Sequence, residues 1–243
     1  MDGCAMASGS PPPRFRLRSS AECSPNIWLT GRTSCTSPVP PSNPVRSIPP
    51  GSEELLKDYP GASVYCVDSL NACLGEGALA IEAAKLAETG IGAEEVFKKV
   101  QAMRKRVNEY CTVHSLEFLR RAGRVKGPAA FFGNLMGVKP IIVADADGAQ
   151  AAFKKVKGRQ ASFREIVALL KESIVNPEEQ TIYLAHADCS EEEVEELKAL
   201  VKAEIPCKEI FVGYIGPIIG ASIGPDAVAL IGFGKEVTFR AAE

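Results

Sequence analysis

The feature that most constrains the fold is the regular alternation of short apolar runs and helical patterns after about residue 50. Ser63–Val67 predicts a strand, and Gly75–Ala87 and Ala93–Asn108 predict two helices after it. Alanines recur on the first helix at helical spacing, which favours a closely packed face. This strand–helix–helix order is typical of a parallel α/β fold. We therefore predict that residues 51–110 form the closing part of a parallel α/β domain.

A different pattern begins near Cys111. Lys139–Ala144 and Ala151–Val156 predict two strands, and Asp145–Gly148 between them predicts a hairpin turn. Ser190, followed three residues later by a glutamate, predicts the capped start of a helix. The other expected elements are the helices Glu53–Lys57, Ser115–Ala122, Phe131–Met136 and Ser162–Ser173 and the strands Thr181–His186, Glu209–Ile215 and Ala227–Gly232. The hairpin and the helical crossover connections between the later strands together predict an α+β domain with a mixed sheet over residues 111–243.

Residues 1–50 show neither a strand nor a helix period. They contain ten of the 17 prolines, many serines and several arginines, and almost no acids. This composition predicts disorder. It superficially resembles a transit peptide, but prolines at this density would break the amphipathic helix that such peptides form. An alternative hypothesis is that the segment is non-native, produced by out-of-frame or mis-started translation.

Composition excludes several classes of protein. A formal net charge of −2 and a pI near 5.9 give no basic field for nucleic acid or an anionic membrane. No apolar run reaches the roughly 18 residues that a membrane span needs. The eight cysteines show no CxxC spacing and the chain has two histidines, so we expect neither a metal site nor a disulfide framework. We expect a cytoplasmic protein without a cofactor.

Two glycine-rich segments need interpretation. Gly75 and Gly77 follow a strand and open a helix, but the third glycine and the acid of a dinucleotide fingerprint are lacking, so a tight turn with close helix packing is favoured. Residues 213–234 are too rich in glycine and proline for an ordinary strand. They predict either a cradle of backbone amides or a hairpin with bulges.

At this point the residues carry a family resemblance. VDSLNACLGEGALAIEAAKLAETG, CTVHSLEFLRRAGRVKGPAAFFGNLMGVKPII and EIFVGYIGPIIGASIGPDAVALIGFG occur in the order found in DegV proteins. The second is similar to the family's "FTVDSLEYLKRGGRI…LLGIKPI" and the third to its "GPVIGAHxGPGALA" loop. The resemblance covers about residues 52–238. It implies a fatty acid buried between two α/β domains and, in some members, presentation of that lipid to a fatty acid kinase subunit.

The resemblance also implies site residues. Arg124 matches the family arginine that faces the fatty acid carboxylate, and a guanidinium suits that partner. Ser222 stands where the family has histidine, so it can hydrogen-bond the head group without adding positive charge. The apolar pocket is expected to include Phe131, Phe132, Leu135, Ile218 and Ile219. The family's N-terminal half, with its "SSxLSGTY" loop, has no counterpart in residues 1–50, so we expect this chain alone to bind fatty acid weakly or not at all.

Two alternatives remain open. An acyl hydrolase or another small-molecule enzyme would use Ser222 or Cys189 as its nucleophile, although no GxSxG elbow or signature cysteine stands near His114 or His186. A regulatory or nucleic-acid-binding protein would use the basic clusters 104–106 and 120–124, which are otherwise typical of a solvated helix face. We expect a binding protein without catalytic activity. We expect neither a nucleic-acid partner nor stable membrane insertion.

Overall fold

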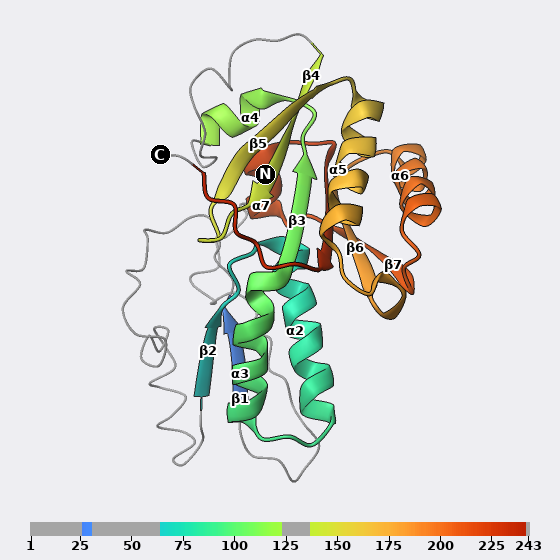
Figure 1. Ribbon diagram of the computed structural model, residues 1–243. Coiled ribbons are helices and arrows are strands. Elements are labelled where there is room, and N and C mark those ends of the chain that lie inside the picture. Colours follow the sequence, from blue (N-terminus) through green and yellow to red (C-terminus); the bar gives the residue numbers. More distant parts are fainter. Residues whose placement is uncertain (1–25, 31–63, 123–136, 242–243) are drawn as a thin grey trace, which may run out of the picture.

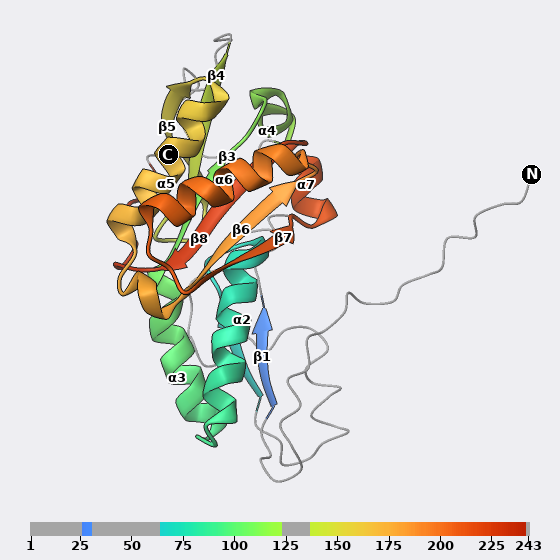
Figure 2. The same ribbon diagram turned by 90° about the vertical axis from the view of Figure 1, so that its right-hand side faces the viewer.

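The computed structural model describes residues 26–30, 64–122 and 137–241, which form a small two-stranded unit and a six-stranded sheet (Figures 1 and 2). The two strands of the small unit lie with helices α2 and α3 at one end of the molecule, and the larger sheet occupies the other end. The α/β class predicted from the sequence is confirmed. The predicted helices Glu53–Lys57 and Phe131–Met136 lie outside the described residues.

The small unit contains β1 (Asn26–Thr30), β2 (Val64–Asp68), α2 (Cys73–Glu88) and α3 (Ala93–Met103). β1 and β2 pair in parallel over five residues each. β1 falls inside the segment predicted to be disordered, so that prediction is wrong at these positions. A run of three apolar residues is too short to show a period, and its backbone partner lies far along the chain in β2.

Helix α2 packs partly through small residues, but of the alanines whose spacing predicted a closely packed face only Ala83 is fully buried. Ala78, Leu79 and Ala83 are fully buried, while the neighbouring Ala80, Ala84 and Ala87 are only half-buried. A side chain at Gly75 would lie 2.9 Å from the Asn71 Cβ. Gly75 therefore allows the loop before α2 to approach the helix closely, which supports the packing interpretation of the Gly75–Gly77 motif.

The predicted helix Ala93–Asn108 is wrong at its C-terminal end. α3 stops at Met103, a single turn η1 (Arg104–Arg106) follows, and Val107–Thr112 is strand β3. β3 lies inside the large sheet, paired with β4 on one side and β8 on the other. β3 forms backbone hydrogen bonds with a strand on each side, and its side chains are buried on both faces of the sheet. These interactions outweigh the local helical pattern, which ends at the turn Arg104–Arg106. The large sheet thus begins at Val107, four residues before the predicted boundary.

The large sheet is mixed. β3 pairs antiparallel with β4 and β8, β4 with β5, and β6 with β8, whereas β6 and β7 are parallel. In spatial order its strands are β5 (Gln150–Lys157), β4 (Val138–Ala144), β3 (Val107–Thr112), β8 (Ala227–Phe233), β6 (Thr181–Ala187) and β7 (Glu209–Tyr214). The mixed sheet predicted for this half of the chain is confirmed.

The β4–β5 hairpin turns at the Asp145–Gly148 segment, as predicted. The buried Asp145 carboxylate accepts hydrogen bonds from the backbone N–H groups of Asp147 and Ala149, at 3.0 and 2.9 Å. Gly148 adopts a φ of 77°, and a Cβ there would lie 2.9 Å from the Leu70 Cα. The hairpin therefore meets the loop between β2 and α2 at a point where only glycine fits.

The helices of this half divide between the two faces of the sheet. α5 (Arg159–Ser173) and α6 (Glu191–Glu204) pack on one face, and α4 (Leu116–Ala122), α7 (Pro217–Ile223) and the start of α2 lie on the other (Figures 1 and 2). A further turn, η3 (Pro177–Glu179), precedes β6. The Ser190 hydroxyl accepts a hydrogen bond from the Glu193 N–H, so the predicted cap is confirmed.

Helix α7 differs from both predictions for the glycine-rich segment. Pro217 stands in its first turn, where the missing N–H group costs nothing and the fixed φ favours a helix. Gly224, with a φ of 83°, ends it against the Phe118 ring. The segment is therefore a helix between two strands rather than a hairpin or an extended cradle.

Two cores separate along the faces of the sheet. One, beneath α5 and α6, includes Phe163, Leu170, Ile182 and Leu230. The other contains Val67 and Leu79 of the small unit together with Tyr183, Ala185 and Ile231 of the sheet, and so joins both halves of the chain.

Candidate functional site

An apolar cavity lies where the start of α2, the helices α4 and α7, and one face of the large sheet meet. Its volume is about 60 Å³. The helices contribute Ala72, Cys73, Leu119, Ala122, Ile219, Ser222 and Ile223, Ile215 comes from the turn before α7, and the sheet with the start of β5 contributes Glu109, Cys111, Ile142, Gln150, Ala185, Ala229 and Ile231. Most of these side chains are hydrocarbon, so the cavity suits an apolar group.

A row of small side chains explains why there is space at this place. Cys111 of β3 is the ladder partner of Ala229 on β8, and Ala229 is the partner of Ala185 on β6. All three point to the face that α4 and α7 cover, and all three line the cavity. Three adjacent strands thus carry short side chains at one level, where leucine or isoleucine would fill the gap beneath the helices.

Three of the residues predicted for the site lie in the described part of the chain: Ile218 and Ile219 for the pocket, and Ser222 for the carboxylate. Ser222 and Ile219 are part of its lining, but Ile218 is 55% exposed and is not. Ile218 instead directs more than half of its surface to solvent from the same helix. The prediction for Ile218 is therefore corrected. Arg124, Phe131, Phe132 and Leu135 lie outside the described residues.

The Ser222 side chain is partly exposed, so it lies where the cavity meets solvent. Its hydroxyl donates to the Ile218 carbonyl, one turn earlier in α7, at 3.3 Å. The oxygen keeps its capacity to accept a further hydrogen bond.

Glu109 is a cavity residue that sequence reasoning missed. It lies in β3, is 9% exposed, and its Oε2 atom has no hydrogen-bond partner among the described residues. Burial raises the pKa of its carboxyl to about 7, against the opposing effect of hydrogen bonds from the Ala72 backbone and the Gln150 side chain. The predicted helix ended at Asn108, one residue before Glu109, and no strand was predicted here, so nothing in the sequence marked this glutamate as buried.

Two thiols share the cavity with Glu109. Burial raises the pKa of both Cys73 and Cys111, and the nearby Glu109 carboxylate acts in the same direction. Both therefore stay protonated near neutral pH, and a protonated thiol is a poor nucleophile. Their role in the site is to provide small apolar surface.

Comparison with known proteins shows the family of the chain. The family model described as "Uncharacterised protein, DegV family COG1307" matches residues 51–235. A DegV domain-containing protein of Clostridium perfringens is 39% identical over 186 residues, which are 76% of this chain and 64% of that protein. The chain belongs to the DegV family.

Solved DegV structures share the fold. The structure of DegV from Bacillus subtilis, described as a fatty acid binding protein, is 30% identical with a TM-score of 0.61, covering 72% of this chain and 61% of that one. A Thermus thermophilus DegV family protein, whose description is fatty acid binding, is 26% identical with a TM-score of 0.66, covering 75% and 65%. This DegV chain thus spans less than two thirds of the length of these relatives.

Cys189, one of the two nucleophiles named for the enzymatic alternative, lies where its thiol is not activated. Burial raises the pKa of the Cys189 thiol to about 11. Cys189 lies with Glu193 and Asp226, and ligand atoms of all three are within 4.8 Å of one another. The Arg159 guanidinium already sits there, with Nε 2.9 Å and Nη2 3.0 Å from the two Glu193 carboxylate oxygens and Nη2 3.7 Å from the Cys189 sulfur. An arginine thus holds the position that a metal ion or an activating base would need.

The described basic side chains of the predicted clusters are engaged locally. Arg104 donates to the Asp68 carbonyl at 2.6 Å and Arg106 to the Gly234 carbonyl at 2.8 Å. Lys105 and Arg121 pair with Glu236 and Glu117, at 3.7 and 2.7 Å. These contacts favour a structural role over a phosphate-binding surface. Among the described helices, none is long and apolar enough to cross a membrane.

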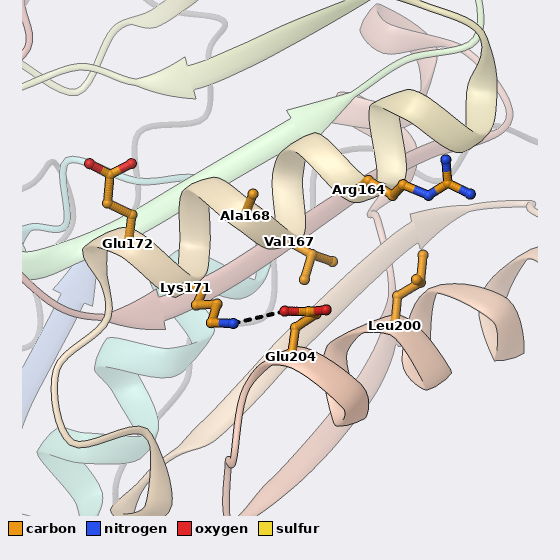
Figure 3. A pocket seen from close by; sticks show the side chains of 7 residues that line it. All are labelled: Arg164, Val167, Ala168, Lys171, Glu172, Leu200 and Glu204. Carbon is orange, nitrogen blue, oxygen red and sulfur yellow. Dashed lines mark hydrogen bonds and ion pairs between the residues drawn. The ribbon is translucent and has the colours of Figure 1, made fainter.

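A second depression, of about 570 Å³, lies between α5 and α6 on the opposite face of the sheet (Figure 3). Lys171 and Glu204 form an ion pair of 2.8 Å across it, and Arg164 points away from that pair. Both partners are about half exposed, so the depression is an open surface groove with charged walls. It is unsuited to enclosing an apolar chain, and the smaller cavity beneath α4 and α7 remains the candidate site.

Proposed function

We propose that this DegV chain binds a long-chain fatty acid, with the acyl chain in the cavity beneath α4 and α7. The observation that carries the proposal is the row Cys111–Ala229–Ala185, which forms an apolar floor under two short helices. The fatty acid binding of the Bacillus subtilis and Thermus thermophilus relatives supports the same assignment.

The driving force is the transfer of methylene groups out of water. About 14 methylenes at roughly 0.8 kcal/mol each contribute about 11 kcal/mol. Association costs about 4–15 kcal/mol in lost freedom and ordering. Binding is therefore favourable only when most of the acyl chain is enclosed, and the polar end contributes mainly orientation.

The size of the cavity predicts weak binding. Ligand sites usually measure about 300–1,000 Å³, whereas this cavity holds about 60 Å³. The cavity therefore holds a whole acyl chain only if α4 and α7 move away from the sheet. Otherwise part of the acyl chain must lie outside the cavity. Either event has a free-energy cost, and we expect a weaker affinity than that of the full-length relatives.

The carboxylate belongs at the rim of the cavity. Ser222 is partly exposed there, and its hydroxyl would have to turn from the Ile218 carbonyl to donate to the carboxylate. Arg124 follows Ala122, a lining residue at the end of α4, by two positions, and we propose that its guanidinium pairs with the carboxylate. With the acid at the rim, a fatty acid kinase subunit could transfer the γ-phosphoryl group of ATP to the carboxylate, forming an acyl phosphate and ADP.

Native mass spectrometry of the purified 243-residue chain, followed by titration with palmitate, tests the proposal. We expect a one-to-one complex, weakened about tenfold by Arg124→Gln because a charge-assisted hydrogen bond is lost. The matched control is Arg121→Gln, since Arg121 is exposed and paired with Glu117, and we expect it to bind as the parent does. Absence of any acyl complex would refute the proposed function, and equal effects of both variants would refute the role of Arg124.

A further inference from the structure

The unexplained group in the cavity is the Glu109 carboxyl. The side chain is buried in β3 with Ile231 as its ladder partner on β8, among otherwise apolar neighbours on that face. Its Oε2 atom is buried and has no hydrogen-bond partner among the described residues. Burying a carboxyl oxygen without a partner destabilises a protein. Within the described part of the chain nothing pairs with Oε2, so a group bound in the cavity could supply the missing hydrogen bond.

A structural role accounts for only part of this carboxyl. Helix α2 begins after Ala72, where no side chain caps the helix. The Ala72 backbone and the Gln150 side chain are the hydrogen-bond donors that act on the Glu109 carboxyl. They explain why an acid is tolerated next to the start of α2, but they leave Oε2 unpaired.

We propose that Glu109 makes this site selective for an acyl chain that carries a hydroxyl group, which forms a hydrogen bond with Oε2. The inference rests on the proposed function and names the class of fatty acid. A hydroxyl suits this carboxyl in either protonation state, because it donates to a carboxylate and accepts from a carboxylic acid. A plain hydrocarbon at the same place would remove water from Oε2 and offer nothing in return.

Water is the alternative partner. A cavity of about 60 Å³ can hold an ordered water molecule, and Glu109 and Gln150 could bind it. A hydroxyl on the ligand would take over the hydrogen bond of that water, whereas an unsubstituted chain would either displace the water at a cost or leave it in place. If a ligand hydroxyl is the partner of Oε2, a hydroxylated acyl chain should bind more tightly than an unsubstituted one. If water is the partner and stays in place, the unsubstituted chain should bind more tightly.

Competition binding to the 243-residue chain distinguishes them. Octadecanoic acid competes with a set of isomers that carry one hydroxyl at successive positions along the middle of the chain, with native mass spectrometry as the readout. We expect one isomer to bind about tenfold more tightly than octadecanoic acid. If every hydroxylated isomer binds more weakly than octadecanoic acid, the inference is overturned, and this comparison needs no variant to fold.

Two variants separate hydrogen bonding from packing. Glu109→Gln keeps a hydrogen-bonding group of the same shape, and we expect the preference to survive. Glu109→Met keeps the length but removes the polar atoms, and we expect the preference to disappear while octadecanoic acid binds at least as well as before. An unchanged preference in folded Glu109→Met would overturn the inference. Failure of every acyl chain to bind the parent would instead refute the proposed function.

Discussion

Cys111 and Ala229 are partners across the antiparallel ladder of β3 and β8, and together they form the floor of the apolar cavity. Ala229→Val would add two methyl groups into that space. We expect a gain of about 0.5–1 kcal/mol in the free energy of unfolding, because a cavity is filled. We also expect weaker binding of fatty acid, since the same space is lost. Denaturant unfolding and palmitate titration measure the two effects.

Ala227→Val is the matched control, because Ala227 lies two residues earlier on the same strand and face. It is fully buried but does not line the cavity. Overpacking there should destabilise the chain by about 1–2 kcal/mol. A cavity at Ala229 would be contradicted if both variants changed stability in the same direction and by the same amount.

Glu109 should make stability depend on pH. Its carboxyl has an ordinary pKa of 4.5 in the unfolded chain and a pKa of about 7 when folded, because of burial. The folded state thus holds the proton more tightly, so stability is full below about pH 4.5 and is lost as the pH rises to about 7. The loss amounts to at most about 3 kcal/mol.

The measurement is the free energy of unfolding of the parent minus that of Glu109→Gln, between pH 5 and 8. Subtraction removes the contribution of His186, whose pKa is lowered by burial, because both proteins carry it. The thiols of Cys73 and Cys111 face the same carboxyl and stay protonated throughout this range, since their pKa values are raised. Parallel pH profiles for the two proteins would show that Glu109 does not titrate in this window.

Local signals in the sequence predicted the elements that depend on local chemistry. The Asp145–Gly148 turn and the Ser190 cap are fixed by hydrogen bonds within a few residues, and the structure contains both. β3 was missed because its strand pairing depends on β4 and β8, which follow much later in the chain. α7 was missed because glycines conceal a helical period, although Pro217 marks its start.

The site shows the same division. Ser222 and Ile219 were predicted for the site, and both line the cavity, while their contact with a fatty acid stays a prediction. Glu109 was missed because no strand was predicted over Val107–Thr112: the predicted helix took the first two residues of β3, and the burial of Glu109 follows from the strand pairing. The row of small residues could not be predicted at all, because it depends on the register of three strands that are far apart in the sequence.

Arg159 should be important for stability on the other side of the sheet. Its guanidinium binds both carboxylate oxygens of Glu193 and lies 4.5 Å from the centre of the Phe163 ring. The Arg159 side chain is only 13% exposed, so Arg159→Ala should lower the free energy of unfolding by about 2 kcal/mol, measured by denaturant titration. Lys171→Ala removes the half-exposed pair with Glu204 and should change stability too little to resolve. Equal losses would contradict the difference in burial.

Gly148 should be intolerant of any side chain. Both Gly148 and Gly137 have a φ of 77°, a conformation that costs alanine about 1–2 kcal/mol. The two positions differ in space, because a Cβ at Gly148 would lie 2.9 Å from the Leu70 Cα, whereas a Cβ at Gly137 would meet nothing within 4 Å. Gly148→Ala should therefore cost at least about 1 kcal/mol more than Gly137→Ala. The extra cost arises where the hairpin touches the loop leading into α2, so Gly148→Ala should also weaken palmitate binding at the cavity beside that loop. If thermal unfolding gave equal losses for the two variants, the close approach of the hairpin to Leu70 would be refuted.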